Sequence, residues 1–255
     1  MARVLSLAVN DVRSIESARL SFSPHINLID GLNGSGKTSL LESIYMLASA
    51  KSFRSGSNQS LVRKGQDAAV VYGEIDSGSG SRKLGVKLGI TGDRQLRLDG
   101  SPVRSTDESL RILPVMVIDS ESFKLALGSP SERRKFVDWG VFHVEHRFLE
   151  AWRRTQRALK QRNSLLRRGN ISDSSMDGWE KELASSAQQV DSYRSAYIYL
   201  FISAFDNVRR QLSLGGDNDY GVELSYRRGW DRDARRWRAR WPRDRAHRRR
   251  AARRS

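Results

Sequence analysis

Eight consecutive residues near the N-terminus have the types and the spacing of a phosphate-binding loop. They are Gly31, Leu32, Asn33, Gly34, Ser35, Gly36, Lys37 and Thr38, which fit the pattern G-x-x-x-x-G-K-[ST] at every position. The glycines allow backbone conformations that point successive N–H groups at one anion. Lys37 would place its ammonium group on the β- and γ-phosphates, and Thr38 would offer its hydroxyl group to Mg²⁺. These residues predict a nucleoside-triphosphate site.

The residues on both sides of this loop have the patterns of the elements that must position it. Residues 25–30 predict a short strand that leads into the loop. From Thr38 onward the spacing predicts a helix with one apolar stripe, formed by Leu40, Leu41, Ile44, Leu47 and Ala48. A strand before the loop and a helix after it distinguish a phosphate loop from a chance glycine-rich turn. The N-terminal end of the helix would also attract the bound anion.

Three further patterns could carry chemistry, and each has a simpler structural interpretation. Residues 115–119 place an Asp after four apolar residues, as in a Walker B strand, but Ser120 stands where a catalytic Glu is needed. An ordinary buried strand is the favoured interpretation there. Residues 212–216 resemble the signature loop of ABC ATPases, but the glycines more simply end a helix. His143 and His146 lack a third metal ligand at suitable spacing, so we interpret them as helix histidines.

The remaining pattern predicts a mixed α/β half followed by a helical half. Alternating apolar residues predict strands near residues 5–9, 20–22, 70–72, 84–90 and 96–98, with a turn at Asp99 and Gly100. After Pro130, helical spacing predicts two long helices around residues 148–166 and 179–212, joined by a polar linker at 169–178. Two antiparallel helices in a hairpin are the simplest arrangement for these runs.

Composition and charge exclude several classes of protein. The 255 residues contain no Cys, which excludes disulfides and thiolate metal sites. No apolar run is long enough to span a bilayer, and the N-terminus has no segment of signal-peptide length, so we expect a cytoplasmic protein without membrane contact.

Residues 227–255 hold 14 Arg and 3 Asp and thus contribute +11 to the net charge of +16. The rest of the chain is only mildly basic, which permits nucleic-acid contact.

The last residues differ abruptly in composition from those before them. Residues 234–255 are rich in Arg, Ala and Trp and have no periodic apolar face. This composition predicts disorder, and it is typical of a GC-rich gene read in the wrong frame. A genuine Arg-rich arm that binds nucleic acid is the alternative interpretation.

Several long stretches of the chain resemble the bacterial RecF family. The resemblance rests on residues 26–55, on the Leu-Arg-Leu-Asp-Gly segment at 96–100, and on residues 122–167, and it extends from about Arg3 to about Asp233. The Ser52-Phe53-Arg54 step and the run from Pro130 to Trp139 are more specific than the phosphate loop alone. The resemblance implies an α/β fold: a P-loop NTPase of the ABC/SMC-like head type with an inserted helical lobe.

What this resemblance implies about function goes beyond the phosphate loop. It implies a protein of DNA replication, recombinational repair and the SOS response to DNA damage, with ATP and Mg²⁺ as cofactors. It implies binding to single-stranded or gapped DNA, cooperation with RecR and RecO, and an ATP-dependent homodimer. Arg13 matches an early Arg of the family near the nucleotide, although Ser14 departs from the Asn that often follows it.

The resemblance also implies that a part of the family pattern is absent. The signature loop and Walker B strand of the family follow the helical lobe, whereas this chain loses the pattern near Ala234. We therefore expect a truncated or frameshifted member with weak or absent ATP binding and negligible hydrolysis. The expected organisation is an incomplete ATPase lobe at 1–128, a helical lobe at 129–216, the start of a return to the core at 217–233, and the tail at 234–255.

Basic residues of the helical half are the candidates for DNA contact. The main candidates are Arg133, Arg134, Arg153, Arg154, Arg157 and Lys160, and the wider basic set adds Lys135, Arg162, Arg167 and Arg168. For any one of them a solvated helix surface is the simpler interpretation, so only the cluster is suggestive. Two alternative functions remain open: a basic DNA-binding or interaction module without ATPase activity, and a P-loop phosphotransferase for a small molecule.

Overall fold

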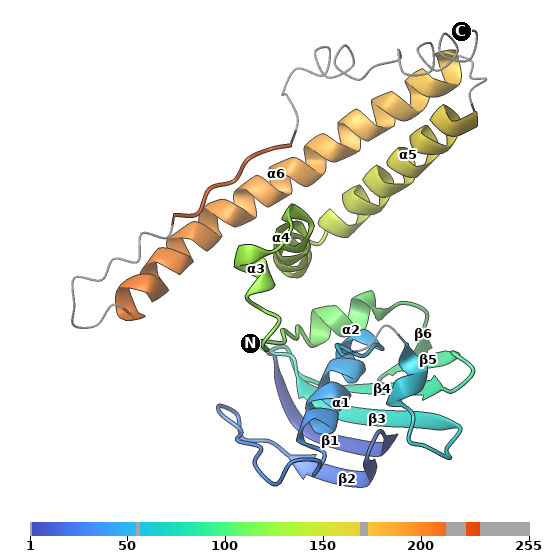
Figure 1. Cartoon of the computed structure of the whole chain (residues 1–255), viewed down its shortest axis with the longest axis vertical. Helices are drawn as coiled ribbons and strands as arrows, with labels where there is room; N and C mark the ends of the chain where they lie inside the picture. The colour runs from blue at the N-terminus through green and yellow to red at the C-terminus, as the bar shows by residue number, and fades with distance from the viewer. Residues whose placement is uncertain (1, 55–56, 169–172, 213–222, 230–255) are drawn as a thin grey trace, which may run out of the picture. The chain divides into compact units, whose positions relative to one another are not determined.

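A computed structural model describes residues 2–54, 57–168, 173–212 and 223–229. The chain divides into two compact units, 1–122 and 123–255 (Figure 1). The division falls six residues before the predicted boundary at 128. Each unit has its own hydrophobic core, and each is described by itself below.

The first unit is built on an antiparallel sheet of six strands in the order β2-β1-β3-β4-β5-β6. The strands are β1 (Arg3–Val12), β2 (Ile15–Ser21), β3 (Ala68–Asp76), β4 (Ser81–Gly89), β5 (Arg94–Leu98) and β6 (Ser101–Val103). The strands predicted near residues 5–9, 20–22, 70–72, 84–90 and 96–98 are confirmed. The predicted turn is confirmed too, because Asp99 and Gly100 join β5 to β6 with φ angles of 50° and 84°.

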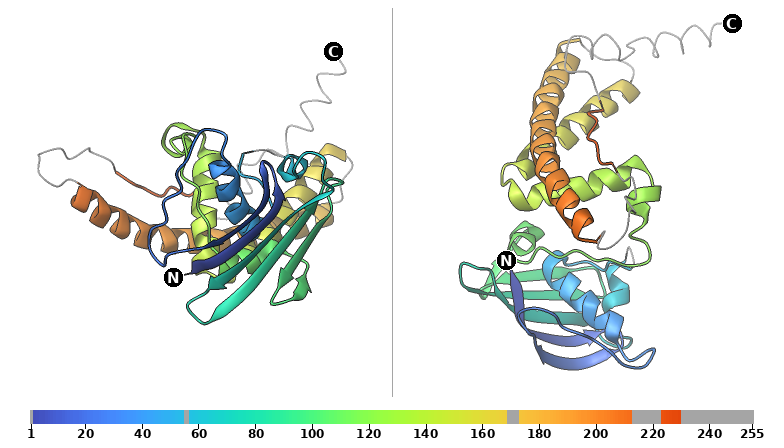
Figure 2. Two further views of the ribbon diagram at one scale, coloured as in Figure 1. Left: turned by 90° about the horizontal axis from the view of Figure 1, so that it is seen from below. Right: turned by 90° about the vertical axis from the view of Figure 1, so that its left-hand side faces the viewer.

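One face of this sheet is covered by helices α1 (Lys37–Ser49) and α2 (Thr106–Ile112), as Figure 2 shows; the 3-10 helix η1 (Asn58–Leu61) follows α1. Alternate strand residues such as Leu7, Val71 and Val86 are buried in one core together with Leu47 of α1. Gly73 lets α1 approach β3 closely, since a Cβ atom there would lie 2.4 Å from Leu47 Cδ2. This packing fixes the helix that follows the phosphate loop.

The predicted strand at residues 25–30 is wrong. These residues pair with no strand in the described part of the chain, and Ile26 and Leu28 are 87% and 88% exposed. An alternating or apolar pattern gives a strand only when a neighbouring strand satisfies its backbone groups. Here β2 is the edge strand of the sheet, and in the described part of the chain residues 25–30 form no ladder with its free edge.

The strand predicted at residues 115–119 is also wrong, both as a Walker B strand and as an ordinary buried strand. The segment is irregular, and Ile118 is 84% exposed. The Asp119 carboxylate accepts the Glu121 N–H and the Ser122 hydroxyl group, each at 3.0 Å. Asp119 therefore stabilises a local turn.

The second unit consists of helices α3 (Lys124–Leu127), α4 (Pro130–Val144), α5 (Phe148–Arg168) and α6 (Asp173–Leu212). Helices α5 and α6 lie side by side (Figures 1 and 2), which confirms the predicted helix pair. The predicted linker at 169–178 is too long, because α6 begins at Asp173. Residues 213–216 of the predicted cap and the tail at 234–255 lie outside the described residues. In the described ranges, no helix is long and apolar enough to cross a membrane.

Ion pairs join the helices of the second unit. Arg194 of α6 donates to both carboxylate oxygens of Asp138 on α4, at 2.7 and 2.8 Å. Burial is the largest single effect on the pKa of Arg194 and lowers it, but the hydrogen bonds and charge of Asp138, together with Tyr226, exceed it in sum and raise that pKa. His143 packs against Trp139, with ring centroids 4.5 Å apart. Among the described residues, no group of three or more His, Asp or Glu side chains could hold a metal ion. His143 lies in α4 as a helix histidine, but the interpretation is wrong for His146, which lies in the turn between α4 and α5.

Residues 223–229 run along α6 (Figure 1). They belong to the segment 217–233 that was predicted to start a return to the core, of which residues 217–222 and 230–233 lie outside the described residues. The Tyr226 hydroxyl group donates to Asp191 Oδ1 at 2.9 Å, and Arg228 pairs with the same buried carboxylate. Within this segment, Leu224, Tyr226 and Arg228 are less exposed than the residues between them. The alternation shows that one side of the segment faces α6.

Tyr226 should ionise only at very alkaline pH. Burial and the hydrogen bond to Asp191 raise the pKa of Tyr226 to about 12, above the usual value near 10 for tyrosine, so the neutral phenol stabilises the folded state. This contribution is complete below pH 10 and is lost as the pH rises toward 12. Absorbance at the phenolate band, measured as wild type minus Tyr226→Phe, should show little ionisation of Tyr226 at pH 11. Half-ionisation near pH 10 would contradict the described contact.

Candidate phosphate-binding site

The phosphate loop takes the backbone conformation that its glycines allow. Gly31, Gly34 and Gly36 have φ angles of 138°, 84° and 98°, where side chains other than hydrogen are strained. A Cβ atom at Gly36 would also lie 3.4 Å from Ile15 Cγ1. Gly36 precedes α1 as its N-cap, and the Leu40 N–H donates to the Gly36 carbonyl at 2.9 Å. The loop therefore leads directly into the N-terminal end of α1.

Lys37 folds back over this loop. Its ammonium group donates to the carbonyl oxygens of Gly31 and Leu32, at 2.7 and 2.8 Å. The contacts place the positive charge at the loop backbone, where a phosphate would compete with the two carbonyls for it. Thr38 is exposed in the first turn of α1, and Leu32, Asn33 and Ser35 are exposed along the loop.

A cavity of about 380 Å³ opens beside the loop. Its volume is within the usual range of small-molecule pockets. Ile15, Ala18 and Leu20 of β2 supply an apolar wall, and Ser35 and Lys37 supply part of the opposite wall. Two carboxylates, Glu16 and Asp30, also line it. The cavity combines an apolar surface with the cation and N–H groups of the loop.

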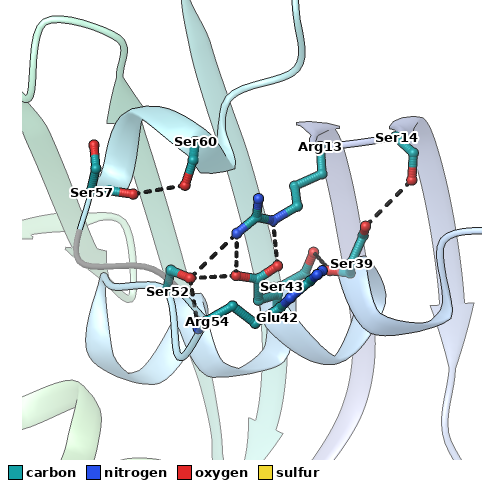
Figure 3. A network of polar contacts seen from close by, with 9 residues as sticks. All are labelled: Arg13, Ser14, Ser39, Glu42, Ser43, Ser52, Arg54, Ser57 and Ser60. Atoms are coloured by element: carbon teal, nitrogen blue, oxygen red, sulfur yellow. Dashed lines mark hydrogen bonds and ion pairs between the residues drawn. The ribbon is translucent and has the colours of Figure 1, made fainter.

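Arg13 is held by a buried carboxylate (Figure 3). Its Nη2 donates to Glu42 Oε1 at 2.7 Å, and its Nε pairs with Glu42 Oε2. Arg13 occupies the turn between β1 and β2, and the neighbouring Ser14 lies 3.3 Å from Ser39, measured between the hydroxyl oxygens. The Ser14 Oγ atom is also 3.5 Å from the position of a Cβ atom at Gly36. The turn therefore contacts the end of the loop through Ser14, while the Arg13 guanidinium is bound to α1.

Sequence reasoning missed Glu42 and gave no role to Ser52. The Ser52 hydroxyl group donates to Glu42 Oε1 and accepts the Arg54 N–H at 3.0 Å (Figure 3). The Phe53 ring packs edge-to-face on Tyr45, with centroids 5.6 Å apart. These contacts fasten the chain that follows α1 back onto that helix. No clear signal for Glu42 was present in the sequence, because this residue lies outside the predicted apolar stripe of the helix.

The DNA candidates of the second unit fall into two groups. Arg133 donates to the carbonyl oxygens of Ala126 and Gly128, and Arg154 pairs with Glu182 at 2.7 Å. The Arg154 contact raises the pKa of Arg154 and lowers that of Glu182. The other main candidates are exposed on α4 or α5 and comprise Arg134, Arg153, Arg157 and Lys160.

The wider basic set also contains side chains that form ion pairs and a side chain that is exposed. Arg162 is buried and pairs with Glu180 at 3.3 Å, and Lys135 pairs with Glu132 at 2.8 Å. Arg167 is exposed near the end of α5. On α5, Arg153, Arg157 and Lys160 are spaced by four and three residues, so they share one face of the helix.

The sheet with its phosphate loop and the helical unit together define the class: a P-loop NTPase fold of the ABC/SMC head type. Residues 3–215 match the RecF/RecN/SMC N terminal domain, and the chain belongs to this family. The resemblance to bacterial RecF is confirmed. The chain is 45% identical over 228 residues to the DNA replication and repair protein RecF of Stutzerimonas stutzeri and to that of Azotobacter vinelandii. The alignments cover 89% of this chain and 60% and 61% of the relatives, so the chain spans about 60% of their length.

Solved structures show the same fold at lower sequence identity. The recombination mediator protein RecF-ATP of the RecFOR pathway superimposes with a TM-score of 0.75 at 23% identity and covers 83% of this chain and 58% of that one. The Smc head domain of Pyrococcus furiosus superimposes with a TM-score of 0.52 at 18% identity, over 84% and 64% of the two chains. These similarities confirm the predicted fold class.

Proposed function

We propose that this chain binds ATP with Mg²⁺ at residues 31–38 and acts on DNA in replication and recombinational repair. The observation that carries the proposal is the glycine loop at the start of α1 with the Lys37 ammonium group on its backbone. It is supported by relatives that are named DNA replication and repair protein RecF and by a structural neighbour described as RecF-ATP. The proposal of ATP binding replaces the expectation of weak or absent binding, because residues 31–38 have the positive φ angles and the lysine position of a phosphate loop. It does not include hydrolysis.

Each residue of the loop has a distinct part in this proposal. The N–H groups of Leu32, Asn33, Gly34, Ser35 and Gly36, together with that of Gly31, surround the phosphates, and the Lys37 ammonium group exchanges two carbonyl contacts for phosphate oxygens. The Thr38 hydroxyl group is a ligand of Mg²⁺. Arg13 belongs to the ATP site through the turn that it stabilises, because the neighbouring Ser14 contacts the loop end.

The DNA part of the proposal uses the exposed cations of the second unit. Arg153, Arg157 and Lys160 share one face of α5, which suits contacts to successive phosphates of a single-stranded or gapped DNA. The proposal also includes RecR and RecO as partners, an ATP-dependent homodimer, a part in the SOS response and a cytoplasmic location. The neighbour described as RecF-ATP of the RecFOR pathway supports the two protein partners. The homodimer, the SOS response and the location rest on the membership of the RecF family alone.

Neutralising two cations of α5 should weaken DNA binding in a salt-dependent way. Because each phosphate contact releases about one counterion, Arg157→Gln with Lys160→Gln should reduce the slope of log affinity against log salt by about 1–2. The measurement is fluorescence anisotropy of a labelled oligonucleotide over a series of salt concentrations. The matched control, Lys51→Gln with Lys64→Gln, removes the same charge from exposed positions of the first unit. An equal loss in both double variants would assign the effect to net charge alone.

Titration of the purified chain with ATP and Mg²⁺, and separately with gapped DNA, tests the function as a whole. Saturable binding of both ligands is the expected result. DNA binding without ATP binding would instead support a DNA-binding module that lacks the ATPase, while ATP binding without DNA binding would support a small-molecule phosphotransferase. A folded chain that binds neither ligand would contradict the proposal.

A further inference from the structure

The face of the sheet opposite α1 has an ordered row of outward-facing residues. Because strand side chains alternate between faces, the neighbours of the buried core residues point away from α1. Cross-strand pairing aligns one such residue from each of five strands: Arg19 of β2, Ala8 of β1, Tyr72 of β3, Gly85 of β4 and Arg97 of β5. The row places a single aromatic side chain between small residues, with an arginine at each end.

Tyr72 is open to solvent within this row. It is 42% exposed, and its two cross-strand neighbours, Ala8 and Gly85, are the smallest residues. A Cβ atom at Gly85 would lie 4.0 Å from Tyr72 Cδ2 and 3.7 Å from Arg97 Cβ. The space at Gly85 would accept a side chain in ordinary contact, so packing does not explain the glycine. A flat, open surface around the ring is the result.

Basic residues surround Tyr72 on the same face. Lys83 and Lys87 lie on β4, each two residues from Gly85, so they face the same side of the sheet as Gly85. Both are exposed. In the described ranges, neither these lysines nor Arg19 and Arg97 form an ion pair.

The carboxylates of β3 on this face lie on one side of Tyr72 and have other partners. Glu74 accepts the Ser81 hydroxyl group at 2.6 Å, and Asp76 pairs with Arg3 at 3.1 Å. On the other side of Tyr72, Val70 of β3 lies between its two cross-strand partners, Lys87 of β4 and Asn10 of β1. The part of the face formed by Tyr72, Lys87 and Arg97 is therefore positively charged.

We propose that this face, centred on Tyr72, binds single-stranded DNA, with one base stacked on the Tyr72 ring and with Lys87 and Arg97 on the flanking phosphates. An exposed aromatic ring on a flat sheet with cations beside it has the chemistry of a base-stacking platform. A duplex hides the faces of its bases, so only a single strand can stack on this ring. The inference rests on the proposed function in DNA repair and adds a second contact surface to the face of α5.

The test is the affinity of the full chain for labelled oligothymidine and for a blunt duplex, measured by fluorescence anisotropy. Tyr72→Thr keeps a residue that favours strands and should weaken oligothymidine binding about tenfold, because one stacked base contributes on the order of 1–3 kcal/mol. Tyr72→Phe retains the ring and should bind within about twofold of wild type. Duplex affinity should be the same in all three proteins.

The matched control is Tyr199→Ala, which removes a tyrosine that is 78% exposed on α6. Its affinity for oligothymidine should equal that of wild type. Equal affinities of Tyr72→Thr and wild type for oligothymidine would contradict base stacking on Tyr72 without contradicting the proposed function. An equal loss of affinity for single strand and duplex would do the same. A wild-type chain that binds no DNA would instead show that the proposed function fails.

A second measurement keeps the inference testable if Tyr72→Thr does not fold. Oligonucleotides with 5-bromouracil, irradiated on the wild-type chain, should crosslink to the peptide that contains Tyr72. Crosslinks confined to peptides of α5 would overturn the platform and leave the α5 contact in place.

Discussion

Replacing Lys37 with alanine is expected to lower the affinity for ATP at least about tenfold, since a hydrogen bond to a charged group contributes ~1.5–3 kcal/mol. Lys37 has the only side chain of the loop that carries a charge, and its ammonium group already lies at the carbonyls of Gly31 and Leu32. The alanine variant also leaves these carbonyls without the cation, which turns the local potential against an anion. Titration calorimetry with ATP and Mg²⁺ measures the effect.

The matched control is Lys64→Ala, which removes an exposed lysine from a turn of the same unit. Its affinity should remain that of the wild-type chain. Thr38→Ala should reduce binding in Mg²⁺ but not in EDTA, because its hydroxyl group would act through the metal ion. Thermal unfolding of each variant without nucleotide separates a loss of binding from a loss of fold. Unchanged ATP binding by Lys37→Ala would place the nucleotide elsewhere.

The phosphate loop could be read from the sequence because its geometry is local. Three glycines at fixed spacing allow the positive φ angles that the structure has, and the helix that follows begins at Lys37, one residue before the predicted start at Thr38. Neither feature depends on a distant part of the chain. Strands β3, β4 and β5 were predictable for the same reason, since short turns join consecutive strands in an antiparallel meander.

The two failed strands depend on distant partners. Residues 25–30 and 115–119 have apolar patterns that suit a buried strand, yet the described part of the sheet offers no strand beside them. Their large side chains are exposed, Ile26, Leu28 and Ile118 among them. A sequence pattern indicates that a segment could form a strand, but whether it pairs within a sheet depends on other segments of the chain.

The orientation of α1 was also predicted only in part. The apolar stripe included Leu40, Leu41 and Ile44, but Leu41 is 48% exposed, and Glu42 and Ser43 are buried toward the sheet. Polar side chains can occupy a buried helix face when their hydrogen bonds are satisfied. The partners of Glu42 are Arg13, 29 residues before it, and Ser52, 10 residues after it, and no periodicity of α1 indicates them.

Replacing Arg13 with alanine is expected to destabilise the first unit by about 3–5 kcal/mol even without nucleotide, because it leaves a buried carboxylate without its partner. Glu42 is fully buried, and the Arg13 guanidinium is one of its two partners in Figure 3, beside Ser52. The φ angle of 50° at this position strains Arg and Ala alike because both carry a Cβ atom, so backbone strain does not explain the expected loss. Urea unfolding, with hydrogen exchange at the amides of β1 and α1, measures the loss in this unit.

A double variant separates this charge effect from a role of Arg13 toward the nucleotide. Arg13→Met with Glu42→Met removes both charges and should recover much of the lost stability, since apolar residues of similar volume replace a buried pair with little net cost. Arg3→Ala is the matched control, because its pair with Asp76 is partly exposed and should contribute only about 0–1 kcal/mol. If Arg13→Ala unfolds like Arg3→Ala, the pair does not hold the turn. Arg13 would then belong to the site only through direct contact with ATP.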